Sequence, residues 1–359
     1  MRGRNGNRIF GASTFHDWGI PLNVAFLAYS YHLVKTKSSD FFMDLLQEWF
    51  ENVEIMRHKE AWAKLPGRHW DLIIAWQGLH SPAELEAFGA DRVVLVPMYD
   101  ACPKTRDEWE PYLGFRVLSF SRTLGDDLKS WGHDVLTVRY WQPVPEASTE
   151  IATGLRGFFW PRQAGLVWSH VRPVMGDSSW DSFHLHVTSP EGASALPSEE
   201  ERARFHIVET SWFEQSSEYK NAVSRANVYF APRRFEGIGQ AVLEAMAMGL
   251  CVVSPDNPTM NEYLVHGQTG LLFNPDAPCA LDFGRVLELG RNARAAAVQG
   301  RSGWEASLPS IRAFLVAPSR RGPKRHPWVA FKGRMSIPLR AVYRAVKSLL
   351  GRPVPEEWR

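Results

Sequence analysis

The chain has little of several features that define common classes of protein. Its three cysteines, Cys102, Cys251 and Cys279, are too few and too scattered for a disulfide framework or a zinc knuckle, and a reducing compartment suits them best. A formal net charge of +2 argues against bulk binding of nucleic acid. The longest apolar runs, such as that at 24–28, are far below the roughly 20 residues that a membrane span requires. We therefore expect a cytoplasmic protein that does not cross a membrane and binds no nucleic acid.

Short apolar segments alternate with helical patterns along most of the chain, which indicates an α/β fold with parallel sheets. Strands are expected in the first half at 24–29, 53–57, 71–76, 92–97, 116–120 and 135–139, and in the second half at 157–160, 184–188, 206–208, 228–231 and 250–254. Among the helices between them, one covers 41–50 and another begins at Ser81, a favoured cap that Pro82 follows.

A Pro-rich stretch at 141–145 and the polar residues after it divide the chain. We expect an N-terminal domain over 1–148, a C-terminal domain over 149–316 and a basic tail over 317–359. The first two are expected to be Rossmann-like domains that face a cleft. In such sheets, ligands bind at the carboxyl ends of the strands.

The segment 228–255 contains the most informative pattern, a strand, a glycine turn, a helix and a second strand. Gly237 and Gly239 open the helix, and Gly249 ends it. Glycines at such a turn let backbone N–H groups approach an anion, and the helix N-terminus adds partial positive charge, which suits a diphosphate. Tight packing explains a Gly-x-Gly turn at least as often.

Glu244 is the only charged residue between Glu236 and Asp256, and it lies in the apolar run 241–248. An unpaired buried carboxylate costs several kcal/mol, so such a residue normally has a partner. A ribose diol, which donates two hydrogen bonds, is a suitable one. The alternative is a glutamate at a helix edge that reaches water.

Glu236 and Glu244, with seven residues between them, resemble the E-x7-E motif of retaining glycosyltransferases with the GT-B fold. The phrase from Phe235 to Gly249 and the segment 261–273 are similar to glycosyltransferase family 4 almost position by position. The resemblance covers about 50 residues, and the N-terminal half resembles the family only in its layout.

The resemblance implies that the domain over 1–148 binds the acceptor and that the domain over 149–316 binds the nucleotide sugar. It also implies a role for each matching residue. Glu236 would hold hydroxyls of the donor sugar, Glu244 the ribose, and Arg162 a phosphate. The backbone cradle near the phosphates or the sugar would consist of Gly237, Ile238 and Gly239.

The chain lacks one basic residue that the family usually has. The family usually carries a lysine five or six residues beyond the position of Arg162, and residues 163–168 contain none. Either Arg172, Arg233 or Lys220 replaces it, or the diphosphate is stabilised less strongly. The chain also lacks an Asp-x-Asp pair, so no essential metal and no cofactor are expected.

The family often places an Asp or His of the N-terminal domain near the sugar. Asp100, at the end of the strand 92–97, is our candidate catalytic partner of Glu236, with a role as a loop or helix cap equally open. His80 is a weaker alternative. His184 and His186 have a spacing that a metal could use, but no third ligand is apparent, which favours a structural role.

The tail at 337–350 has Arg340, Arg344 and Lys347 at helical spacing, opposite apolar residues. It is expected either to lie on an anionic membrane, at its inner face, or to pack back across both domains.

Together these features predict a retaining, metal-independent glycosyltransferase. It would move a sugar from a nucleoside-diphosphate sugar to a glycan, lipid-linked or other hydroxyl acceptor. Two alternatives remain: an inactive protein that binds a nucleotide sugar or glycan, and a sugar-nucleotide epimerase.

Overall fold

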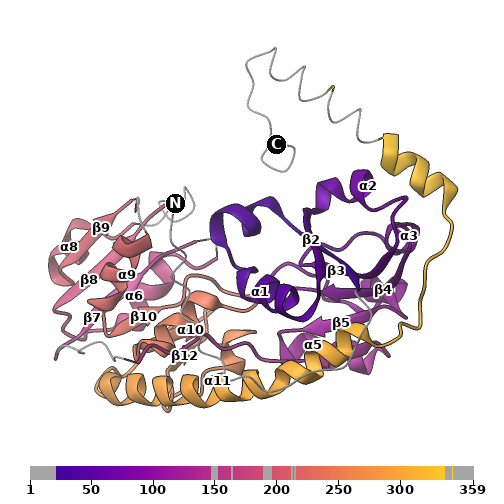
Figure 1. Ribbon diagram of the computed structural model, residues 1–359. Helices are drawn as coiled ribbons and strands as arrows, with labels where there is room; N and C mark the ends of the chain where they lie inside the picture. The colour runs from indigo at the N-terminus through magenta and orange to yellow at the C-terminus, as the bar shows by residue number, and fades with distance from the viewer. Residues whose placement is uncertain are drawn as a thin grey trace, which may run out of the picture.

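The computed structural model describes residues 22–146, 153–162, 165–188, 196–211, 213, 216–335 and 342. These residues form two six-stranded sheets, one in each half of the chain, with helices packed around them (Figure 1). Every strand pair in both sheets is parallel. The expected pair of Rossmann-like α/β units is confirmed.

The N-terminal sheet has the strand order β2-β1-β3-β4-β5-β6. Its strands are β1 (Asn23–Ala28), β2 (Asn52–Arg57), β3 (Trp70–Trp76), β4 (Ala90–Val96), β5 (Arg116–Ser119) and β6 (Asp134–Thr137). Between them lie η1 (His32–Thr36), α1 (Asp40–Trp49), η2 (His58–Glu60), α2 (Ala61–Lys64), α3 (Pro82–Ala87), α4 (Arg106–Trp109), η3 (Glu110–Tyr112) and α5 (Arg122–Ser130). All six predicted strands are present, because apolar runs buried on both faces are typical of parallel strands.

The C-terminal sheet has the order β12-β11-β10-β7-β8-β9. Its strands are β7 (Arg156–Phe159), β8 (Ser182–His186), β9 (Ile207–Thr210), β10 (Val228–Phe230), β11 (Cys251–Pro255) and β12 (Leu271–Phe273). Its shorter helices are α6 (Trp168–Met175), α8 (Glu199–Arg204), α9 (Ser216–Ser224), α10 (Gln240–Ala247) and η4 (Met260–Glu262). The five predicted strands are confirmed, whereas β12 was not predicted.

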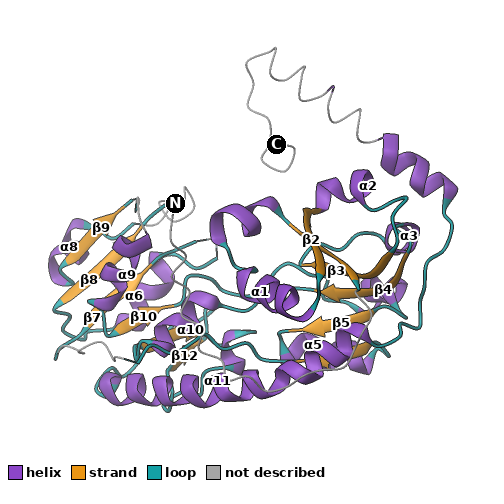
Figure 2. Cartoon of the chain, in the orientation of Figure 1, coloured by secondary structure: helices purple, strands orange, loops and turns teal. Residues whose placement is uncertain are grey.

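One long helix, α11 (Val286–Val316), runs beneath both halves (Figure 2). Its first part packs on α10 and β11 of the second half. Farther along, the ring of Trp304 contacts those of Phe120 and Tyr140 of the first half. At its end, the Arg116 guanidinium donates to the carbonyl of Phe314. The helix therefore joins the two units along their length.

A second junction holds the two sheets together near their carboxyl ends. Glu262 of η4 is buried and accepts hydrogen bonds from the Ser121 hydroxyl (2.8 Å), the Arg122 N–H (2.5 Å) and the Thr123 N–H (3.0 Å). These groups lie at the N-terminus of α5, whose partial positive charge favours a carboxylate. One half of the chain thus caps a helix of the other.

After α11 the chain continues along the outer edge of the N-terminal half and forms a short helix over 327–335. No helix among the described residues is long and apolar enough to span a membrane. The proposed tail helix at 337–350 lies outside the described residues, apart from residue 342, and so does the proposed domain boundary at 148.

Candidate functional site

The two sheets meet where the loop after β4 faces the loop after β10. Asp100 lies in the first loop, and Arg233 and Glu236 lie in the second. Arg233 Nη1 donates to Asp100 Oδ2 at 3.1 Å and lies 4.0 Å from Glu236 Oε2. Two carboxylates from opposite halves therefore share one guanidinium, as expected if Asp100 faces Glu236 across the interface.

The electrostatics of this group are unusual. Burial raises the pKa of Glu236 to about 7, because Arg233, which lowers it, does not offset burial and the repulsion from Asp100. Burial also raises the pKa of Asp100, against the lowering effect of Arg233. Strongly perturbed carboxyls at the carboxyl ends of two sheets are typical of functional sites.

Two polar atoms of the group are buried without a hydrogen-bond partner among the described residues, Asp100 Oδ1 and Arg233 Nε. An unsatisfied buried polar atom costs about 1–3 kcal/mol, and in native proteins it usually has a specific reason. Neither carboxylate caps the helix that follows it, since the N-cap of α10 is Gly239 and that of α4 is Thr105. The free atoms are consistent with a polar ligand at this position.

The glycine turn before α10 is tightly packed. A Cβ on Gly237 would lie 2.8 Å from Met98 Cβ and 3.0 Å from Asp100 Oδ1, so only glycine lets the two loops approach this closely. Gly239 has a φ of 71°, which other residues rarely adopt. Ile238 is buried in the core, so only its backbone could contact a ligand. Close packing, which the sequence left open, is thus one role of this turn.

Glu244 lies on α10 and faces α9. It is only partly buried, so the expectation of a buried carboxylate is wrong: this fifth residue of α10 lies near the exposed Lys220 of α9. Burial raises the pKa of Glu244, and Lys220 lowers it. The side chain makes no hydrogen bond with any described residue, and its carboxylate is available for a ligand.

Arg162 follows β7 and lies close enough to Glu236 for the two charges to interact. Its charge lowers the pKa of Glu236, and both Glu244 and Arg162 act on the hydroxyl of Tyr219. The guanidinium stacks on the Trp160 ring at 4.0 Å and forms no ion pair within the described part of the chain. An unpaired guanidinium held on an aromatic face is well suited to bind phosphate.

Of the three cations proposed to replace the missing lysine, one is excluded. Arg172 Nε pairs with Glu201 Oε1 at 3.3 Å, and its guanidinium stacks on Phe205, away from the site. Arg233 is engaged by Asp100, and Lys220 remains beside Glu244.

Two tyrosines that the sequence did not single out complete the site. Tyr29 and Tyr31 follow β1, their rings stack with centroids 6.1 Å apart, and they are 42% and 40% exposed. Burial raises the pKa of Tyr31, the hydrogen bond to Gln77 lowers it, and the charges of Asp100 and Arg233 also act on it. Exposed tyrosines next to the carboxylates offer flat faces on which a sugar ring can stack.

The histidine candidates lie elsewhere. His80 Nε2 is 3.1 Å from His58 Nδ1, so it faces the neighbouring histidine and not Asp100. His184 and His186 both contact the Thr210 hydroxyl, at 2.8 Å and 2.6 Å, which accords with a structural role. Among the described residues, one group has ligand atoms close enough for a metal ion, the largely exposed His69, Asp71 and Asp91, which are not part of this site.

Comparison with known proteins identifies the architecture. A family profile described as glycosyl transferases group 1 matches residues 169–283, which include Glu236 and Glu244. Among solved structures, the fold is similar to a glycosyltransferase from Rickettsia africae (TM-score 0.56, 11% identity, covering 82% of this chain and 98% of that one). It is also similar to sucrose-phosphate synthase from Thermosynechococcus elongatus (TM-score 0.55, 14% identity, 81% and 97% coverage). The fold is GT-B.

A third GT-B structure is similar as well, HepE of Anabaena in complex with UDP-glucose (TM-score 0.53, 13% identity, 80% and 100% coverage). At these identities the likeness establishes the fold alone. No curated protein sequence matches the chain.

Proposed function

We propose that this protein is a retaining glycosyltransferase that uses a nucleoside-diphosphate sugar, similar to members of family 4. The observation that carries the proposal is the group of Asp100, Arg233 and Glu236, in which carboxylates from both halves of a GT-B fold meet with unpartnered polar atoms. The profile match over the second half and the nucleotide-sugar complex of HepE support the same activity.

Each part of the donor has a side chain suited to it. Glu236 and Asp100 lie at the interface of the halves, where the sugar would be placed. Arg162, with an unpaired guanidinium, would bind the diphosphate together with the N–H groups of the glycine turn. Glu244, which has no hydrogen bond to any described residue, would accept hydrogen bonds from the ribose.

The acceptor would approach from the N-terminal half. Tyr29 and Tyr31 provide an exposed aromatic surface next to Asp100, which favours a carbohydrate portion in the acceptor.

The proposed chemistry is front-side substitution. The bond from the anomeric carbon to the β-phosphate oxygen breaks, and a bond to the acceptor hydroxyl oxygen forms on the same face. The acceptor proton passes to the departing phosphate oxygen, so the products are a glycoside with retained configuration and a nucleoside diphosphate. The protein then supplies positioning and charge stabilisation and needs no separate general base.

The test is a thermal-shift panel of nucleotide sugars, followed by incubation of each stabilising ligand with and without acceptor hydroxyls. A tight ligand raises the melting temperature by mass action. A retained-configuration glycoside, identified by NMR, supports the proposal. Binding without hydrolysis or transfer identifies an inactive sugar-nucleotide protein, and release of a free epimer without acceptor identifies an epimerase.

Metal independence is tested in the same assay. We propose that Arg162, Lys220 and the α10 N-terminus neutralise the leaving diphosphate, so transfer should persist in excess chelator. Complete loss of transfer that manganese or magnesium restores would contradict this part of the proposal.

A further inference from the structure

The short helix at 327–335 presents an apolar face to solvent. Trp328, Phe331 and Met335 are 73%, 56% and 45% exposed, and the rings of the first two stack with centroids 5.7 Å apart. At 100° per residue the three side chains fall within one narrow arc of the helix. We call Trp328, Phe331 and Met335 the aromatic face.

The opposite side of the same helix is packed on the protein. Val329 and Ala330 contact the core of the N-terminal half, and a Cβ on Gly333 would overlap the indole of Trp62. The exposure of the aromatic face therefore does not reflect an undocked helix. The helix packs on the N-terminal half through Val329, Ala330 and Gly333. Its larger apolar side, the aromatic face, is not covered by any described residue.

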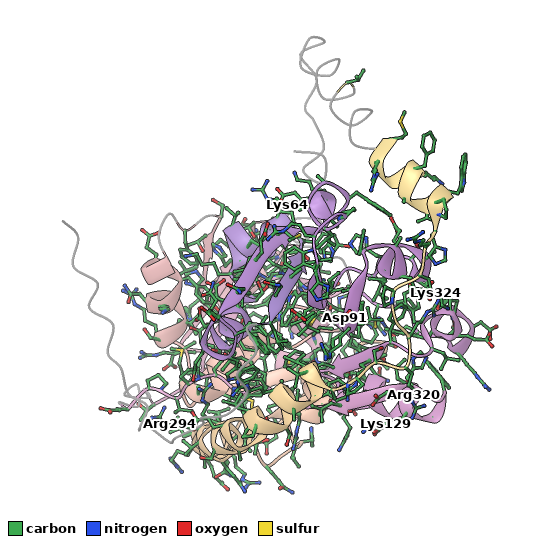
Figure 3. The ribbon with its side chains drawn as sticks, turned by 45° about the vertical axis from the view of Figure 1, so that its right-hand side comes forward. Lys64, Asp91, Lys129, Arg294, Arg320 and Lys324 are labelled. Carbon is green, nitrogen blue, oxygen red and sulfur yellow. The ribbon has the colours of Figure 1, made fainter. Side chains whose placement is uncertain are left out.

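The chain just before the helix is anchored by a buried carboxylate. The side chain of Glu86 is 2% exposed and binds Arg321 Nε at 2.5 Å, His326 Nε2 at 2.5 Å and Lys324 Nζ at 3.3 Å. Figure 3 shows Lys324 where the chain reaches this helix, whose side chains project from the edge of the molecule. The aromatic face thus has a fixed orientation relative to the N-terminal half.

The charged side chains of the chain segment that contains this helix are all basic. Between Glu305 and Glu356 the sequence contains eleven Lys and Arg and no Asp or Glu, although the whole chain has a net charge of only +2. Lys332 and Arg334 are exposed, flank the aromatic face and form no ion pair with a described residue. A surface that binds here must tolerate or prefer negative charge.

We propose that the aromatic face docks on an anionic lipid bilayer, with Trp328, Phe331 and Met335 in the interfacial region and Lys332 and Arg334 against lipid phosphates. Tryptophan and phenylalanine favour the membrane interface, and a basic rim adds attraction to anionic headgroups. The basic side chains beside the aromatic face favour an anionic bilayer over a second copy of this chain, because two such faces in contact would bring like charges together.

The first experiment is co-sedimentation of the full chain with vesicles. We expect binding to phosphatidylcholine mixed with phosphatidylglycerol and little binding to phosphatidylcholine alone. The combined variant Trp328→Ala, Phe331→Ala and Met335→Ala should reduce binding about tenfold or more. The matched control is Val208→Ala, Val265→Ala and Val298→Ala, which removes comparably exposed apolar side chains elsewhere and should bind as the wild type does.

A second measurement reports on the face itself. Cys102 and Cys251 are buried and Cys279 is exposed, so Cys279→Ser leaves a background in which one introduced cysteine can be labelled. An environment-sensitive dye on Met335→Cys should shift to the blue and brighten when anionic vesicles are added. The same dye on Val298→Cys, on α11, should not respond.

Several results would overturn the proposal. One is a wild type that does not bind anionic vesicles, and another is a folded aromatic-face variant that binds as well as the wild type. If Arg340→Ala, Arg344→Ala and Lys347→Ala abolish binding while the aromatic-face variant retains it, the downstream segment binds the lipid instead. A wild-type dimer that the aromatic-face variant makes monomeric, without vesicle binding, would assign the face to a second copy. The readout is lipid binding, so it is independent of the proposed activity.

Discussion

Glu236 is buried, shares Arg233 with Asp100 and does not cap a helix. Its contacts with a sugar would matter most while the anomeric carbon gains positive charge, so they should appear in the rate of the chemical step. We expect Glu236→Ala to slow single-turnover transfer about a hundredfold or more, in line with the roughly 3–4 kcal/mol that one preorganised polar contact supplies.

The control for this variant is binding of the free nucleoside diphosphate, which carries no sugar and should bind with nearly unchanged affinity. A variant that melts earlier but transfers at nearly the normal rate would reduce Glu236 to a structural residue.

The raised pKa of Glu236 gives a second prediction. Burial holds this pKa near 7 instead of about 4.5, so the free protein ionises Glu236 only as the pH rises through neutrality. If the ionised form accepts hydrogen bonds from the sugar, kcat/KM should increase as the pH rises through about 7 and level off above it, since kcat/KM reports the free enzyme. Glu236→Gln should lose this limb of the pH profile. The same limb in the variant would assign the titration to another group.

A substitution of Glu244 tests the part of the donor site that is proposed to bind the ribose. Its carboxylate has no hydrogen bond to any described residue, and it faces Lys220. We expect Glu244→Gln to weaken binding of the nucleoside diphosphate by about 1–3 kcal/mol, the cost of losing one charged hydrogen-bond partner. Calorimetric titration measures this directly, and unchanged affinity would contradict the ribose assignment.

Among individual residues, the sequence predicted those that lie within the glycosyltransferase-like motif. It did not predict those that are distant in the sequence and come close to the motif only in the folded protein. Asp100 was proposed because the family places an Asp or His after a middle strand, and the end of a parallel strand defines one edge of the sheet. Tyr29 and Tyr31 could not be told from core aromatics, since their exposure depends on β1 ending at Ala28. Arg172 was proposed to replace the missing lysine, and its partner Glu201 could not be recognised because it is distant in the sequence.

At the scale of elements, α11 shows what periodicity misses. Its apolar residues serve two different surfaces, first α10 and β11 of the second half and then aromatic residues of the first half. No single apolar stripe runs through its 31 residues, so the pattern did not predict a helix joining the halves. The three-residue strand β12 was also missed.

Two glycines of α11 give a matched test of its packing. A Cβ on Gly290 would overlap the backbone carbonyl of Gly249, which cannot move aside as a side chain can, whereas a Cβ on Gly303 meets nothing within 4 Å. We expect Gly290→Ala to destabilise the fold and Gly303→Ala to stabilise it by about 0.5–1 kcal/mol, the helix preference of alanine over glycine. Urea titrations measure the free energy of unfolding of both variants. Equal changes in this free energy would argue against close contact at Gly290.

At the scale of the whole molecule, contacts far apart in the sequence hold the two units and the C-terminal segment in place. Glu262 of the second half caps α5 of the first, and Glu86 of the first half binds Arg321 and His326 beyond α11. The sequence could not predict either contact, because a glutamate in an amphipathic segment looks the same whether its partner is solvent or a distant arginine.

The contact between Glu86 and the C-terminal segment can be tested by changing the pH, because it depends on the ionised carboxylate. Burial alone would raise its pKa, but hydrogen bonds from Arg321, His326 and Lys324 outweigh it and lower the pKa to about 2. Because the pKa is lower in the folded protein than in the unfolded chain, the stabilisation is present above about pH 4.5 and is lost as the pH falls toward 2. The shift corresponds to a contribution on the order of 3 kcal/mol to the free energy of unfolding at neutral pH.

We therefore expect Glu86→Gln to lower the free energy of unfolding at pH 7 and to approach the wild type near pH 2, if both variants still fold there. The control is Glu288→Gln, which removes an exposed partner of Arg285 on α11 and should change stability little. A second readout locates the effect. Since Arg320, Arg321, Lys324 and Arg325 are sites for trypsin, release of the segment should speed their cleavage at pH 8 in Glu86→Gln. A variant that loses stability with no faster cleavage there would show that Glu86 supports its own half of the fold and does not anchor the C-terminal segment.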